Sequence, residues 1–172
     1  MIKIISCLAT ILLFSLNLQV FSMDYTKLSH RIVGAYSHEL AEKKGLFFDG
    51  GGGAMMCDIK IISVSYTAFD ALNIEGARKL YVEVMEEYLR RINADKSIRP
   101  YLHNYPFLYE NVELRIGFDD VSGNMMGNGY VSLMHLVRHK IYYKGYDSEK
   151  REFYTLHEET YEQAKQIVLG CQ

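Results

Sequence analysis

The stretch that decides the fold of this chain runs from Ile74 to Phe118 and reads IEGARKLYVEVMEEYLRRINADKSIRPYLHNYPFLYENVELRIGF. Its first part, residues 74–94, predicts a long amphipathic helix, because apolar residues recur at spacings of three, four and seven. The apolar face of this helix consists of Ala77, Tyr81, Val84, Met85, Tyr88 and Ile92. Asn73 precedes the helix and is the expected N-cap residue.

The same stretch ends in a predicted strand, residues 111–119, whose side chains alternate between apolar and polar. The apolar positions are Val112, Leu114, Ile116 and Phe118, and the polar positions are Glu113, Arg115 and Asp119. Strict alternation is typical of a strand with one face on a core and one face in water, which is the habit of antiparallel sheets. The stretch therefore predicts a helix packed across one face of such a sheet.

Further segments complete the predicted fold. Apolar spacing indicates a helix within residues 23–44, and β-rich composition indicates strands at 57–67, 130–137 and 140–146. The last helix is expected to begin at Thr155, because Thr155 and Glu158 form a capping-box pattern.

A glycine-rich run, DGGGG at residues 49–53, separates the first predicted helix from the first predicted strand. Such a run can let a backbone approach an anion closely, but this one lacks the Gly-Lys-Ser/Thr ending of a phosphate-binding loop. We interpret it as a flexible linker. The expected fold class is α+β: an antiparallel sheet of about four strands in one domain, residues 23–172. The long helix crosses one face of the sheet, and helices lie at both ends of the mature chain.

The N-terminal residues 1–22 have the pattern of a secretory signal peptide. Lys3 supplies a charged beginning, an apolar run follows, and Val20-Phe21-Ser22 offers a cleavage site. The alternative is an uncut membrane anchor, but the apolar run is broken by polar residues and is shorter than the about 20 residues that a span needs. We expect an exported protein, periplasmic or secreted, with no stable membrane span after cleavage.

Charge and motifs exclude several classes of function. The formal net charge is −2 and the chain has no basic run, so the electrostatic footprint of a nucleic-acid-binding protein is absent. The sequence has no G-x-S-x-G, H-E-x-x-H or C-x-x-C pattern. We therefore expect no metal and no cofactor, and the sequence favours a protein that is not an enzyme.

The mature chain keeps two cysteines, Cys57 and Cys171. In an oxidising compartment an even number of cysteines is compatible with a disulfide, which here would tie the C-terminus to the sheet. Two unpaired thiols are the alternative, and the sequence leaves both open.

The connection after the long helix holds the densest group of aromatic and cationic residues. We take Arg99, Tyr101, His103 and Tyr105 as candidate binding residues, because loops held by a scaffold often carry function. Tyr130 and His135 are further candidates. The competing interpretation is that the apolar members of this loop close one end of the core.

These observations lead to two hypotheses about function. The first is an exported, non-catalytic binding or interaction module for a protein or small-molecule partner that the sequence does not identify. The second is a small ligand-pocket protein or hydrolase with its site between helix and sheet. A pocket that joins Arg99, His103, Tyr130 and His135 favours the second hypothesis, and scattered positions favour the first.

Export leads to the first testable prediction. N-terminal sequencing of the protein recovered from the producing cell should begin near Met23. Recovery of the intact N-terminus, Met1, from the cytosolic fraction would contradict it.

Overall fold

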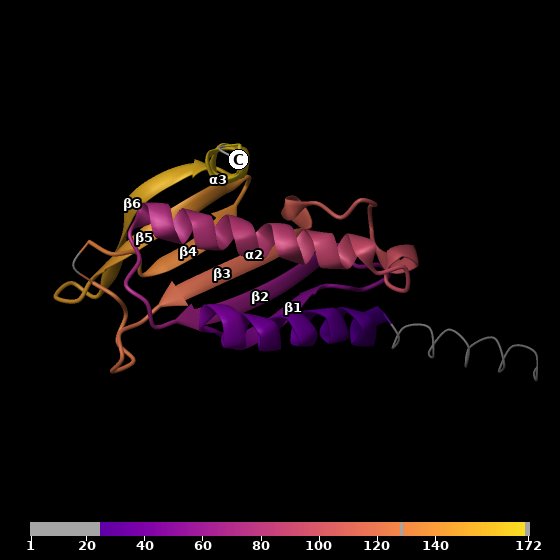
Figure 1. Ribbon diagram of the computed structural model, residues 1–172, viewed down its shortest axis with the longest axis horizontal. Coiled ribbons are helices and arrows are strands. Elements are labelled where there is room, and N and C mark those ends of the chain that lie inside the picture. The colour runs from indigo at the N-terminus through magenta and orange to yellow at the C-terminus, as the bar shows by residue number, and fades with distance from the viewer. Residues whose placement is uncertain (1–24, 128, 171–172) are drawn as a thin grey trace, which may run out of the picture.

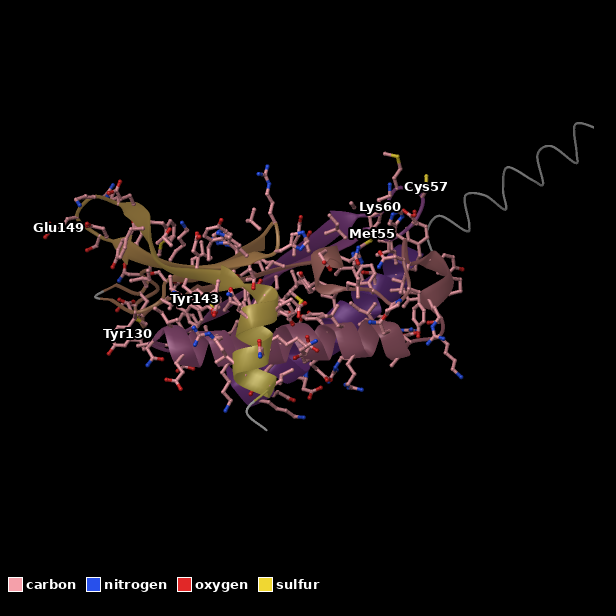
Figure 2. All side chains as sticks on the ribbon, turned by 90° about the horizontal axis from the view of Figure 1, so that it is seen from above. Met55, Cys57, Lys60, Tyr130, Tyr143 and Glu149 are labelled. Carbon is pink, nitrogen blue, oxygen red and sulfur yellow. The ribbon has the colours of Figure 1, made fainter. Side chains whose placement is uncertain are left out.

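A computed structural model describes residues 25–127 and 129–170 of the chain. The expected signal peptide and Cys171 lie outside the described residues. Figure 1 shows a six-stranded sheet crossed by α2 and by the helical residues 25–44, with α3 beside β6. In the perpendicular view of Figure 2, these helices lie on one side of the sheet. The class is α+β, as predicted.

Helix α2 (Ile74–Ala94) confirms the predicted helix. Every residue of the predicted apolar face is buried, and Val82 is buried as well. The N-cap prediction is also confirmed, because the Asn73 side-chain oxygen accepts a hydrogen bond from the Gly76 backbone nitrogen at 2.9 Å. The Tyr81 hydroxyl donates to the Leu114 carbonyl at 2.8 Å, which ties α2 to the sheet.

The sheet is mixed, whereas the prediction was an antiparallel one. Its order is β1-β2-β3-β4-β5-β6, and β2 (Ile61–Ala68) runs parallel to β3 (Val112–Phe118). The parallel pair follows from the long connection through α2, since two strands joined by a crossover helix run in the same direction. The other neighbours are antiparallel, including the hairpin of β4 (Leu133–Val137) and β5 (Lys140–Asp147). The alternation predicted for β3 is confirmed by its buried apolar positions.

The interpretation of the glycine run as a linker was wrong. Residues 50–53 belong to β1 (Leu46–Ala54), which pairs with β2 in the register Gly51↔Val64. Glycine weakens a strand because it loses much backbone freedom and has no side chain to pack. The ladder of hydrogen bonds to β2 overrides that local preference.

The predicted start of the last helix was also wrong. Residues 152–160 form β6 (Glu152–Thr160), which pairs with β5, and α3 spans Tyr161–Leu169. The capping box is real but begins at Thr160, whose side chain accepts from the Gln163 backbone nitrogen. The sheet therefore has six strands and not about four.

Tyrosines fill much of the space between the helices and the sheet. Their rings are fully buried and their hydroxyls find partners, as buried phenols require. Tyr66 bonds to Tyr88 and, at 2.7 Å, to the Ser37 hydroxyl, while Tyr161 donates to Glu86 at 2.7 Å. Burial raises the pKa of the Tyr88 hydroxyl, so this group stays protonated.

Across residues 25–127 and 129–170, no helix combines the length and the apolar content needed to cross a bilayer.

Packing of α2 gives the second prediction. Val84→Asp should unfold the domain, because an unpaired buried carboxylate costs several kcal/mol against a typical stability of about 5–15 kcal/mol. The control is Lys79→Ala, which removes an exposed side chain from the opposite face of the same helix. Urea unfolding followed by circular dichroism measures both variants. Equal midpoints would show that α2 is not packed as described.

Candidate functional site

The residues predicted from sequence to bind a partner lie in three separate places, the loop after α2, Tyr130 and His135. The loop with Arg99 and Tyr105 lies at the end of the sheet where β2 begins, because Ile59 donates a backbone hydrogen bond to Tyr101 at 2.7 Å. Tyr130 lies at the opposite end of the molecule (Figure 2). His135 lies on β4, near the middle of the sheet. These positions do not share one pocket, and the binding roles of these residues stay predictions.

The loop after α2 is fixed by its own contacts. Asn93 holds Phe107 in place, with its amide bonded to both the backbone nitrogen and the carbonyl of that residue at 2.7 and 2.9 Å. The Phe107 ring is buried, which confirms that it closes one end of the core. The Arg99 guanidinium stacks over the Tyr105 ring at 4.3 Å and donates to the Asn93 carbonyl at 3.0 Å.

An Asp–His pair sits beside this loop and bears on the hydrolase hypothesis. The Nδ1 atom of His103 lies 2.7 Å from a carboxylate oxygen of Asp58. Cys57 is next to Asp58 in sequence and is exposed, but in the described part of the chain no hydrogen bond joins its sulfur to His103. A nucleophile must lie within hydrogen-bond reach of its base. The three residues do not form a catalytic triad in this arrangement.

The Cys57 thiol forms no disulfide here, and Cys171 lies outside the described residues. The pairing of these two cysteines stays a prediction.

His135 belongs to the face of the sheet that faces away from the helices. Its ring stacks on Tyr142 of the next strand, with centroids 5.5 Å apart and planes at 17°. Burial, together with the cations Lys144 and Arg115, lowers the pKa of His135, so the ring is neutral at pH 7. Its described hydrogen bonds and ion pairs include no carboxylate, which leaves it without the orienting acid of a general base.

A buried charged cluster that sequence reasoning missed joins α2 to β5 and β6. Arg78 Nε donates to a carboxylate oxygen of Glu159 at 2.7 Å, and the Tyr143 hydroxyl donates to the same oxygen. Burial acts to lower the pKa of Arg78, but the hydrogen bond to Glu159, the charge of Glu159 and the interaction with Tyr143 together outweigh burial and raise the pKa. Because its charges are paired, the cluster is a structural link. The sequence gives no signal of it, since Arg78 and Glu159 are 81 positions apart.

A groove that sequence reasoning also missed runs between the helical residues 25–44 and the edge strand β1. Its volume is about 250 Å³. We call it the β1 groove, and its lining consists of Ser29, His30, Val33 and Gly34 from the helix with Phe48, Gly51, Gly52 and Ser63 from β1 and β2. The signal for it was the glycine run, which was read as flexibility rather than as a bare strand.

The glycines around this groove differ in what the fold demands of them. A side chain at Gly53 would meet the Ile61 carbonyl at 2.0 Å, so the backbone requires glycine there. A Cβ atom at Gly34 or Gly52 would meet nothing within 4 Å. Glycine within a helix or strand costs about 0.5–1 kcal/mol relative to alanine. Packing therefore does not explain these two glycines. Gly34 leaves space on the helix side of the groove, whereas Gly52 is opposite Ser63, whose side chain bonds to the exposed Glu113 on the open face of the sheet.

Comparisons of the chain with known protein families, with curated proteins and with solved structures find no match.

The loop gives the third prediction. Phe107→Ala should lower the free energy of unfolding by about 3–5 kcal/mol, because the ring is fully buried. His103→Ala, in the same loop, should change it by less than about 1 kcal/mol, since its pair with Asp58 is largely exposed. Chemical denaturation measures both. A larger loss for His103→Ala than for Phe107→Ala would overturn the division of this loop into structural and surface residues.

Proposed function

We propose that this chain is an exported, non-catalytic binding module that takes up an extended segment of a partner protein along the free edge of β1. The observation that carries the proposal is that the outer edge of the sheet lacks side chains over four residues. The four consecutive glycines, residues 50–53, belong to the edge strand β1 and lie beside an open groove.

The chemistry of a strand edge selects its ligand. Within the described residues β1 pairs with β2 alone, so the backbone N–H and C=O groups on its outer side have no neighbouring strand to bond to. Such groups are obligatory hydrogen-bonding groups, and an extended polypeptide matches their spacing. Recognition by strand addition draws affinity from this ladder and specificity from pockets for alternate side chains.

Proteins usually protect an exposed edge with charges, prolines or bulges. The strand β1 has a bulge between Phe48 and Gly50 and one charged residue, Asp49. The Asp49 carboxylate accepts a hydrogen bond from Thr67 at 2.9 Å, which holds it on the face of the sheet. The glycines beyond it add no side chain that would obstruct an incoming strand.

The other edge of the sheet is built differently. Strand β6 carries Glu152, Glu158 and Glu159, and Glu158 forms an ion pair with Lys140 at 2.7 Å. Charged side chains of this kind disfavour pairing with a further strand. The contrast between the edges supports β1 as the binding edge.

Two features support the non-catalytic part of the proposal. The candidate residues Arg99, Tyr130 and His135 lie in the loop after α2, at the opposite end of the molecule and on β4, and the Asp58–His103 pair has no bonded nucleophile among the described residues. The space between α2 and the sheet is occupied by buried side chains such as Tyr81 and Met85, where the hydrolase hypothesis needs a site. Export rests on the signal-peptide pattern of residues 1–22.

The fourth prediction tests strand addition. Ten-residue peptides selected by display against the purified protein serve as probes, and calorimetry measures their affinity. Methylation of successive backbone nitrogens should weaken binding by about tenfold at alternate positions and by less than about twofold between them, because only every second N–H faces the edge. Uniform loss along the peptide would contradict strand addition.

A matched pair of variants locates the site. Gly34→Leu should fill the β1 groove and abolish peptide binding while leaving the fold intact, since its Cβ meets nothing within 4 Å. The control is Ala35→Leu, the next residue, which is exposed and lines a different depression, toward α2. Equal binding by both variants would place the peptide elsewhere. A third outcome would refute the proposal: the wild-type protein binds no peptide but forms a dimer, and Gly34→Leu dissociates that dimer while Ala35→Leu does not. The occupant of the groove would then be a second copy of the chain.

A further inference from the structure

We infer that the β1 groove is a pocket for one side chain of the bound segment, and that this side chain joins an apolar body to a hydroxyl group, as threonine and tyrosine do. The inference rests on the proposed function and adds the chemical class that the groove selects.

The central observation is an unpaired hydroxyl in the groove wall. Ser29 is 1% exposed, and its hydroxyl oxygen has no hydrogen-bond partner among the described residues. The same residue lines the groove. A buried polar group without a partner destabilises the folded chain, and in native proteins such a group needs an explanation. A ligand atom that bonds to this hydroxyl supplies one.

A second serine of the same helix shows the usual arrangement. The Ser37 hydroxyl donates back to the Val33 carbonyl at 2.8 Å and lies 2.7 Å from the Tyr66 hydroxyl. Bonding to the carbonyl four residues earlier is common for helical serines. Ser29 makes no such bond, so a ligand group that reaches its hydroxyl meets no competing partner among the described residues.

The remaining lining defines what else can enter. Val33 and Phe48 supply apolar surface, and the described lining residues include no carboxylate, lysine or arginine. A charged side chain would lose its hydration there without an opposite charge. Besides Ser29, the polar side chains of the lining are Ser63, whose hydroxyl already donates to Glu113, and the exposed His30. A hydroxyl on an apolar body needs a single hydrogen bond.

The direction of entry follows from the pleat of a strand. Successive side chains of a strand point to opposite faces, so every second side chain of a segment added to β1 faces the helical side of the sheet. At Gly51, which is opposite the buried Val64, β1 has no side chain of its own, and the Phe48 ring lies 3.2 Å from where a Cβ atom would stand. The groove beside Ser29 lies between this ring and the helix, and its volume of about 250 Å³ accommodates a threonine or a tyrosine side chain.

The test uses the display-selected peptides in pairs that differ by one hydroxyl. At the position facing the groove, threonine is compared with valine and tyrosine with phenylalanine, against the wild-type protein and Ser29→Ala. We expect the hydroxyl-bearing peptide to bind about two- to tenfold more tightly to wild type, the range that one hydrogen bond supplies. Ser29→Ala should abolish that preference while its melting temperature stays equal or rises, since alanine is the better helix former.

Each outcome decides between the two proposals. A hydroxyl preference that persists in Ser29→Ala, or equal binding of both members of a pair to wild type, overturns the inference and leaves strand addition standing. Failure of every peptide to bind overturns both. Loss of the preference in Ser29→Ala with unchanged affinity for the valine or phenylalanine peptide supports the inference, because the apolar contacts with Val33 and Phe48 remain.

Discussion

The packing of α2 against the parallel pair β2 and β3 is the interaction on which the rest of this structure depends. The helix leaves the end of β2 and returns the chain to the start of β3, so its apolar face must lie over both strands. Tyr81 fixes this arrangement, with a buried ring and a hydroxyl bonded to the Leu114 carbonyl. Once this pair is set, β1 and the strands β4 to β6 add to either side as antiparallel neighbours.

A sheet covered on one face by helices has two kinds of exposed surface: its open face and its two edges (Figure 1). The open face carries polar side chains that bond to one another, as Ser63 does to Glu113 and Thr67 to Asp49. The edge β6 carries charges and leads directly into α3. The edge β1 has little side-chain cover, because residues 50–53 are all glycine, although a Cβ atom at Gly50 or Gly52 would meet nothing within 4 Å. The two edges therefore differ in their side chains, charged on β6 and absent over residues 50–53 of β1, and this difference supports β1 as the binding edge.

The sequence predicted those elements whose signal is local. Periodicity was sufficient for α2 and β3, since one side of each is buried along its whole length. Strand β1 was missed because glycine has no periodicity and a low strand preference, so its conformation depends on the ladder to β2. Strand β6 was missed because Thr155 and Glu158 have the sequence pattern of a capping box, whereas the capping box that starts the helix is formed by Thr160 and Gln163. The β1 groove was out of reach, because residues 29–34 face residues 48–52 only after the helix has docked.

Edge and groove contribute different terms to recognition. A backbone ladder binds any extended segment with similar strength, so the edge alone gives affinity without selectivity. The groove makes affinity depend on one side chain of the ligand. The Ser29 hydroxyl, which has no partner among the described residues, makes affinity depend on the polarity of that side chain. A hydrogen bond that a ligand completes at such a group contributes about 0.5–1.5 kcal/mol net, which corresponds to about a two- to tenfold gain in affinity. Ser37, eight positions along the same helix, shows that the fold can satisfy a buried serine. Ser29, in the wall of the β1 groove, is left without a hydrogen-bond partner among the described residues, and this contrast is the reason for proposing that a ligand supplies the partner.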